Sequence, residues 1–78
     1  MNQQLRTFVE VTITDLYSAL QAGNIGSAKL KFGTLVGVAV SVNTEAVYAL
    51  HSIASTVSGM TEREEIASAI SVVTDYLS

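Results

Sequence analysis

Residues 32–61 read FGTLVGVAVSVNTEAVYALHSIASTVSGMT and carry a single formal charge at neutral pH, that of Glu45. Thirteen uncharged residues separate Lys31 from Glu45, and sixteen separate Glu45 from Glu62. Both runs are shorter than the roughly 20 apolar residues that cross a bilayer as a helix, and both contain Ser, Thr or Asn. We therefore expect this stretch to be buried against protein, with no membrane partner.

The first part of this stretch belongs to a segment, Ser27 to Val42, that fits two kinds of secondary structure. Val36, Val38, Val40 and Val42 share one parity, as they would in a strand or β-hairpin. A helix instead gives an apolar stripe of Ala28, Phe32, Leu35, Ala39 and Val42 and a polar stripe of Ser27, Lys31, Thr34 and Ser41. Because the polar residues recur with the spacing of a helix and do not alternate as they would in a strand, we predict a helix. A hairpin or strand over residues 29–42 is the alternative.

The predicted helix has a third face on which glycines recur. Gly26, Leu30, Gly33, Gly37 and Val40 follow one another at intervals of three and four residues. A glycine inside a helix costs roughly 1 kcal/mol relative to alanine, so Gly33 and Gly37 need an explanation. Close approach of another helix is one explanation. A bend, a β-bulge or a hairpin turn is the other.

The segment before it, Asn2 to Ala22, has the pattern of an amphipathic helix. Its apolar positions recur every three or four residues: Leu5, Phe8, Val9, Ile13, Leu16, Tyr17 and Leu20. A strand is the rival interpretation, because polar and β-branched residues alternate from Val9 to Thr14. The helical period extends to Leu20 and the alternation does not, so we predict a helix that stops at Gly23.

Two further helices are predicted after Val42. The third begins after Asn43 or Thr44 as N-cap, has Glu45 in its first turn, and ends at Gly59. Its apolar stripe is Ala46, Val47, Leu50, Ile53, Ala54 and Val57. The fourth opens with a capping box, in which the Thr61 hydroxyl and the Glu64 carboxylate satisfy free backbone donors. Its inward residues are Ile66, Ala69, Ile70, Val73 and Leu77.

These segments predict an all-α fold, with residues 1–78 forming a single helical domain. Short connections between helices place consecutive helices antiparallel, which gives a compact bundle of about four short helices. An α+β fold is the alternative if residues 29–42 form a hairpin or strand. Charged residues are 14% of the chain, against a typical ~25%, so part of the surface is expected to lie against a partner, with a homo-oligomer as the first choice.

Composition also argues against several kinds of ligand. The chain has no Cys and one His, which excludes a disulfide framework and argues against a metal site. The net charge is −3 with four basic residues, so we expect no nucleic-acid partner. The first residues lack the cationic start and apolar core of a signal peptide, and the expected location is the cytoplasm.

Few residues suggest catalysis. His51 has Ser55 one turn later and Tyr48 three residues before it, but no acidic residue shares that face to orient the imidazole. Glu62, Glu64 and Glu65 are explained by their position at a helix start. We therefore expect no enzyme, with no catalytic residue, metal ligand or cofactor.

The size and acidity of the chain, together with Thr61 to Leu77, invite comparison with one family. In these respects the sequence resembles acyl carrier proteins, whose last helix is similar in texture. That family attaches phosphopantetheine to the Ser of an Asp-Ser-Leu motif. No Ser of this chain follows an Asp, and Ser27, Ser41 and Ser52 follow Gly, Val and His. The resemblance therefore implies size and general architecture, and no carrier function.

Our functional hypothesis is a non-enzymatic module that binds another protein or assembles with itself through the uncharged face of residues 30–58. One form of it is a small viral or mobile-element structural or inhibitor protein. The predicted interface residues are Gly33, Val36, Gly37, Val40, Tyr48 and His51. The alternative is a helical protein that binds a small molecule in a pocket near Tyr48 and His51.

Overall fold

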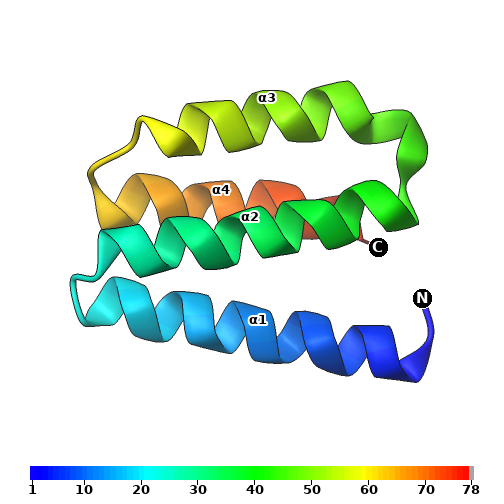
Figure 1. Cartoon of the computed structure of the whole chain (residues 1–78), viewed down its shortest axis with the longest axis horizontal. Helices are drawn as coiled ribbons and strands as arrows, with labels where there is room; N and C mark the ends of the chain where they lie inside the picture. The colour runs from blue at the N-terminus through cyan, green and yellow to red at the C-terminus, as the bar shows by residue number, and fades with distance from the viewer. Residues whose placement is uncertain (78) are drawn as a thin grey trace.

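The computed structural model describes residues 1–77 and is all-α. Its helices are α1 (Gln3–Gln21), α2 (Ile25–Val42), the 3-10 turn η1 (Thr44–Ala46), α3 (Val47–Ser58) and α4 (Arg63–Asp75). Consecutive α-helices run antiparallel, and the N-terminus and the end of α4 lie at the same end of the bundle (Figure 1). The predicted bundle of four short antiparallel helices is confirmed.

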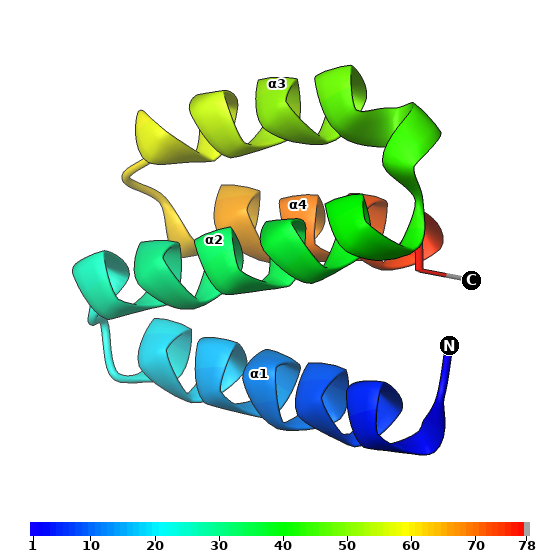
Figure 2. The same cartoon turned by 45° about the vertical axis from the view of Figure 1, so that its right-hand side comes forward.

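The helices are arranged around a central pair. In Figures 1 and 2, α2 lies in front of α4, while α1 and α3 lie on either side of α2. α1 and α3 each contact both α2 and α4, but among the described residues they do not contact each other. The Cα atoms span 31 × 25 × 16 Å. The result is a flattened bundle in which α2 and α4 hold α1 and α3 apart.

Residues 29–42 continue α2, so the alternative of a hairpin or strand is wrong, as is the β-bulge or hairpin-turn explanation of the glycines. Burial follows the helical period and gives the physical reason. Four of the five residues predicted for the apolar stripe of α2 are buried: Ala28, Phe32, Leu35 and Ala39. The fifth, Val42, is 38% exposed because it is the last residue of the helix.

The start and end of α1 are fixed by local hydrogen bonds. Asn2 Oδ1 accepts a bond of 2.8 Å from the Leu5 N–H, which caps the helix. At the other end Gly23 has φ +75°, a left-handed conformation that glycine adopts without steric cost, and the predicted stop is confirmed. Asn24 then caps α2, because its Oδ1 accepts a bond of 3.1 Å from the Ser27 N–H.

The prediction for α1 was right about the helix and partly wrong about its inner face. The strand interpretation of Val9 to Thr14 is wrong, because helical structure is continuous there. Phe8 and Tyr17, expected inside, are 48% and 42% exposed. Thr12 is buried instead, and its hydroxyl donates a hydrogen bond of 2.8 Å to the Phe8 carbonyl. The buried line runs through Val9, Thr12, Leu16 and Leu20, and Phe8 and Tyr17 lie beside it.

The predicted caps of the last two helices do not form. Neither Asn43 nor Thr44 caps α3 through its side chain, because η1 intervenes and α3 starts only at Val47. Glu45 does lie in the first turn, that of η1. The capping box at Thr61 is also wrong. Glu62 is the N-cap of α4, with extended backbone and no side-chain bond, so Thr61 lies one residue too early to cap.

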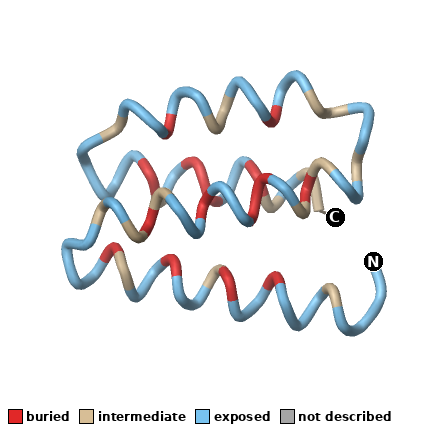
Figure 3. The backbone as a smooth tube through the Cα atoms, in the orientation of Figure 1, coloured by how far each residue is buried: buried red, intermediate tan, exposed pale blue. Residues whose placement is uncertain are grey.

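The core is formed by all four helices, but unequally. The largest fully buried side chains are Leu16, Phe32, Leu35, Leu50, Val57, Ile66, Ile70 and Val73. The inward face of α4 is as predicted, apart from Leu77, which is half-buried. Of the six residues predicted for the inner face of the third helix, only Leu50 and Val57 are buried. Most of α3 is therefore exposed or half-buried, as Figure 3 shows along its whole length.

Candidate functional site

A shallow groove runs along the outer side of the contact between α2 and α3. One part of it, with a cavity volume of about 270 Å³, is lined by Gly33, Val36, Gly37, Val40, His51 and Ala54. A second part, of about 190 Å³, is lined by Gly26, Lys29, Leu30, Phe32, Gly33, Ala54, Val57 and Ser58. Gly33 and Ala54 belong to both parts, so the two are continuous. We call this continuous surface the glycine groove.

The two central glycines explain why the groove exists. A Cβ atom built on Gly33 or Gly37 would meet no other residue within 4 Å. No helix of the same chain therefore comes close to either glycine, and both residues are exposed. A Cβ atom at either position would extend into the groove without a clash inside the monomer. The close helix approach expected from the sequence is thus absent within the described chain.

The groove has an apolar floor and an exposed apolar rim. Val36 forms part of the floor and is 4% exposed. Leu30, one turn before Gly33 on α2, is 77% exposed and has almost no contact with its own chain. A leucine in this position loses most of the free energy that burial of its side chain would give, about 1.5–3 kcal/mol. Leu30 is therefore available for contact with another molecule.

One polar contact closes the end of the groove. Lys29 Nζ donates a 2.8 Å hydrogen bond to the Ser58 carbonyl in the last turn of α3. A cation at this position interacts favourably with the partial negative charge of a helix C-terminus. Lys29 is the one charged residue that lines the groove among residues 1–77. The rest of the groove is uncharged, since His51 is neutral in the formal count at pH 7.

The structure brings five of the six predicted interface residues together and leaves one outside. Gly33, Val36, Gly37, Val40 and His51 all line the glycine groove. Tyr48 does not, and its ring is the most exposed of the large apolar side chains, at 88%. The cavity that His51 lines therefore does not include Tyr48. No hydrogen bond joins His51 to Ser55 in the described part of the chain.

Seven groove residues were not in the predicted interface: Gly26, Lys29, Leu30, Phe32, Ala54, Val57 and Ser58. Leu30 was placed on the glycine face, and its intervals of three and seven residues to Gly33 and Gly37 could have identified it. Ala54 was assigned to the inner face of its helix. Ala54 lines the groove because of how α3 packs on α2, and that packing is not visible in the sequence.

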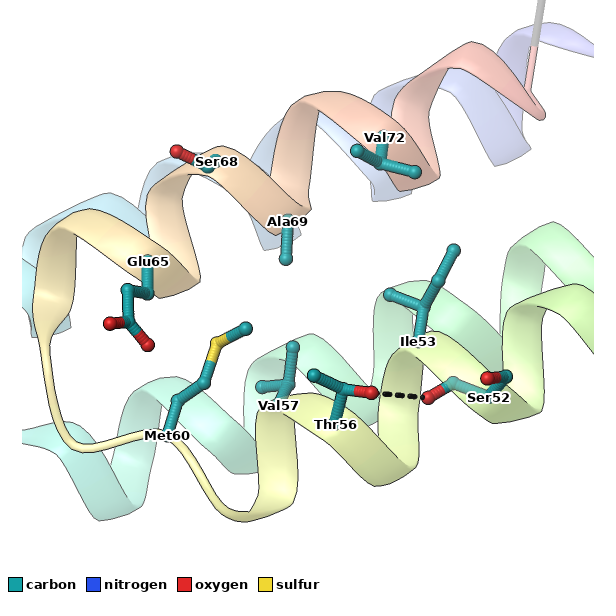
Figure 4. A pocket seen from close by; sticks show the side chains of 9 residues that line it. All are labelled: Ser52, Ile53, Thr56, Val57, Met60, Glu65, Ser68, Ala69 and Val72. Carbon is teal, nitrogen blue, oxygen red and sulfur yellow. Dashed lines mark hydrogen bonds between the residues drawn. The ribbon is translucent and has the colours of Figure 1, made fainter.

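A second cavity lies on the opposite side of α3, between α3 and α4. It has a volume of about 310 Å³ and is lined by Ser52, Ile53, Thr56, Val57, Met60, Glu65, Ser68, Ala69 and Val72 (Figure 4). The sequence analysis did not anticipate it. Its shape depends on which residues of two separate helices face each other, and no local pattern specifies that pairing. We call it the α3–α4 cleft.

Ionisable groups elsewhere form few contacts. Lys31 Nζ lies 3.7 Å from Asp15 Oδ2, and Arg63 Nε lies 3.7 Å from Glu64 Oε1, both at exposed positions. No group of three or more His, Asp or Glu residues in positions 1–77 is placed to hold a metal ion. Buried side-chain polar atoms in the same range all have hydrogen-bond partners. Besides the glycine groove and the α3–α4 cleft, a cavity of about 210 Å³ lies between α1 and α4, lined by Tyr17, Leu20, Gln21, Arg63, Glu64 and Ala67.

No family model matches the chain, and comparisons with curated proteins and with solved structures also gave no match. One helix, α2, is long and apolar enough to cross a membrane by length and composition, with a mean hydropathy of 1.3 over Ile25–Val42. Its inner face forms part of the core, and 28% of the helix is buried within the bundle. The hydropathy of α2 alone does not define a membrane segment, because core helices of water-soluble proteins can be equally long and apolar.

Proposed function

We propose that the protein is a non-enzymatic interaction module of the cytoplasm that associates with a second copy of itself through the glycine groove. The observation that carries the proposal is the open space over Gly33 and Gly37. Each glycine weakens α2 by roughly 1 kcal/mol relative to alanine. Nothing in the bundle requires that loss, since a Cβ would fit at both positions. A partner that approaches the backbone closely would account for it.

The groove and its rim are complementary to each other, which favours a second copy as the partner. Leu30 is an exposed apolar projection, and the Gly37 region of the same helix is an apolar hollow. In a dimer with two-fold symmetry, the same surface of both chains forms the contact. Leu30 of each chain can then pack into the hollow near Gly37 of the other chain. Two α2 helices packed antiparallel would place Leu30 of one copy near Gly37 of the other, at two symmetric points separated by about 10 Å along the helix.

Charge also favours this arrangement. Each chain has a net charge of −3, so two copies repel each other, and like charges within their contact surface would add to that repulsion. The groove carries no formal charge except that of Lys29, and antiparallel packing keeps the two Lys29 side chains at opposite ends. A stable contact needs about 800 Å² from each partner, which is about a sixth of the 4671 Å² surface of the chain.

Substitution of Gly37 by leucine tests the proposal, because it affects association and folding in opposite directions. We expect Gly37→Leu to fill the groove and convert the dimer to a monomer in sedimentation equilibrium. The same variant should unfold at an equal or higher urea concentration when monomeric, because leucine favours a helix more than glycine does. Loss of association could then not be attributed to misfolding.

Ser18→Leu is the matched control, since it adds the same side chain to an exposed position of α1 away from the groove. It should leave the mass of the dimer unchanged. A wild-type chain that remains a strict monomer at high micromolar concentration would refute self-association. A dimer that survives Gly37→Leu would show that association uses another surface.

A further inference from the structure

The α3–α4 cleft has the size and lining of a small-molecule site. Its volume of about 310 Å³ is at the lower end of the range of ligand pockets, about 300–1,000 Å³. The walls are apolar and come from both helices, with Ile53 and Val57 on α3 opposite Ala69 and Val72 on α4 (Figure 4). Val57 lines both the cleft and the glycine groove, but none of the other cleft residues lines the groove. The inference rests on those other residues, so it does not depend on the proposed self-association.

Small and adaptable side chains keep the cleft open. Ala69 is nearly buried, at 8% exposed, but its single methyl group does not fill the space between the helices. Val72 is 45% exposed and forms the wall at the other end. Met60, in the connection between α3 and α4, extends its thioether into the space between the helices (Figure 4). A methionine side chain can change shape to fit different apolar groups, so it can cover a ligand without excluding it.

Most polar groups that line the cleft can act only as hydrogen-bond acceptors for a ligand. The Thr56 hydroxyl donates to the Ser52 carbonyl at 3.0 Å, and the Ser68 hydroxyl donates to the Glu64 carbonyl at 3.1 Å. Their hydrogens are already used, so their oxygens can only accept a bond from a ligand. The Ser52 hydroxyl is the one lining side chain that can still donate.

The charge of the cleft is negative. The Glu65 carboxylate is its one charged lining group, and it lies at the end next to Met60 (Figure 4). The ion pairs of the described chain join Lys31 to Asp15 and Arg63 to Glu64, and neither involves Glu65. No Lys, Arg or His lines the cleft. An anionic ligand would therefore be repelled, while an ammonium group would find a carboxylate and additional acceptor oxygens.

From this combination of an apolar cavity, acceptor oxygens and one carboxylate without an ion-pair partner, we propose that the α3–α4 cleft binds a small organic ammonium compound with an aliphatic body. The aliphatic part lies between Ile53, Ala69 and Val72. The ammonium group lies at the Glu65 end and donates hydrogen bonds to the carboxylate. No bond is formed or broken, so the site is a binding site and requires no co-reactant.

Nuclear magnetic resonance titration of the full ¹⁵N-labelled chain with three probes tests this proposal. Hexylamine, hexanol and hexanoate share an aliphatic body and differ in the charge of the head group at neutral pH. We expect hexylamine to give saturable shifts of amides in residues 52–60 and 65–72. Hexanol should bind there more weakly, and hexanoate most weakly. Added salt should reduce the preference for hexylamine, because the carboxylate is exposed to solvent.

Glu65→Gln should weaken hexylamine binding about two- to five-fold, the upper part of the range for an exposed ion pair, and leave hexanol binding unchanged. Glu62→Gln is the matched control, because it removes the same charge from the start of α4 at a residue that does not line the cleft. It should leave the affinity for hexylamine within two-fold of wild type.

Several results would overturn the proposal. They are equal binding of hexanoate and hexylamine, equal effects of the two Gln variants, an absence of saturable shifts, and shifts confined to the glycine groove. Shifts of amides in residues 65–72 on simple dilution of the protein would show that a second copy occupies the cleft, and would also overturn it, because that segment lines the cleft and does not line the glycine groove.

Discussion

α1 and α3 cover the same central pair of helices from opposite sides, but they are attached in different ways. α1 contributes four buried residues spaced along most of its length, Val9, Thr12, Leu16 and Leu20. α3 contributes two, Leu50 and Val57, which are seven residues apart. The longer stripe of α1 packs against α2 along its length, whereas α3 has the glycine groove on one side and the α3–α4 cleft on the other. The most weakly anchored helix therefore borders both candidate binding surfaces.

Alanine substitution of one fully buried leucine in each helix should give the clearest difference. We expect Leu16→Ala to lower the free energy of unfolding by about 2–5 kcal/mol in urea titration, since Leu16 is fully buried and removal of its side chain leaves a cavity in the core. Leu50→Ala should cost less than Leu16→Ala, because the spaces beside α3 let that helix move inward. An equal or greater loss at Leu50 would show that α3 is held as firmly as α1.

A smaller effect should distinguish the connection after α1 from the connection after α3. Asn24→Ala removes the side-chain cap of α2 and should lower stability by about 1 kcal/mol. Thr61→Ala should change stability by less than about 0.5 kcal/mol, because Thr61 makes no capping bond in the structure. Thermal unfolding monitored by circular dichroism would measure both. A loss at Thr61 as large as that at Asn24 would mean that the capping box forms in solution.

The smallest effect concerns the two lysines of α2 that reach to its neighbours. Lys29→Met keeps an aliphatic stem but removes the bond to the Ser58 carbonyl, and should cost about 0.3–1 kcal/mol. It should also speed hydrogen exchange in the last turn of α3. Lys31→Met breaks an exposed ion pair to Asp15 and should cost close to zero. Both variants should be compared at concentrations where the chain is monomeric, and equal effects would contradict the assignment of Lys29 to the end of α3.

Sequence patterns predicted the fold well where a periodic pattern was long. The helical spacing of the polar residues Ser27, Lys31 and Thr34 correctly predicted α2, although the alternating valines also fitted a strand. The spacing is informative because a helix in a bundle buries one face and exposes the other. The predicted end of the first helix at Gly23 was also correct, since the backbone there has a left-handed conformation that glycine adopts most easily. Signals of this kind depend on neighbours along the chain, and those are visible in the sequence.

Predictions failed where the outcome depends on the exact start of a helix or on which helices pack against each other. The capping box failed by one residue, because the extended backbone at Glu62 makes that residue, and not Thr61, the N-cap of α4. The apolar stripe of the third helix gave no sign that so few of its residues would be buried. The depth of burial depends on how many helices surround α3, and only tertiary packing decides that. The α3–α4 cleft was missed for the same reason, since the gap beside Ala69 appears only when the two helices face each other.

The small number of buried positions in α3 has a consequence for how the protein can evolve. A residue change in α1 has to preserve a line of internal contacts, so folding itself restricts which sequences are acceptable there. In α3, substitutions away from Leu50 and Val57 alter mainly what the surface presents to other molecules. Natural variation in this helix can therefore change binding preferences while the bundle stays intact, and the same property makes α3 a suitable segment for randomised libraries.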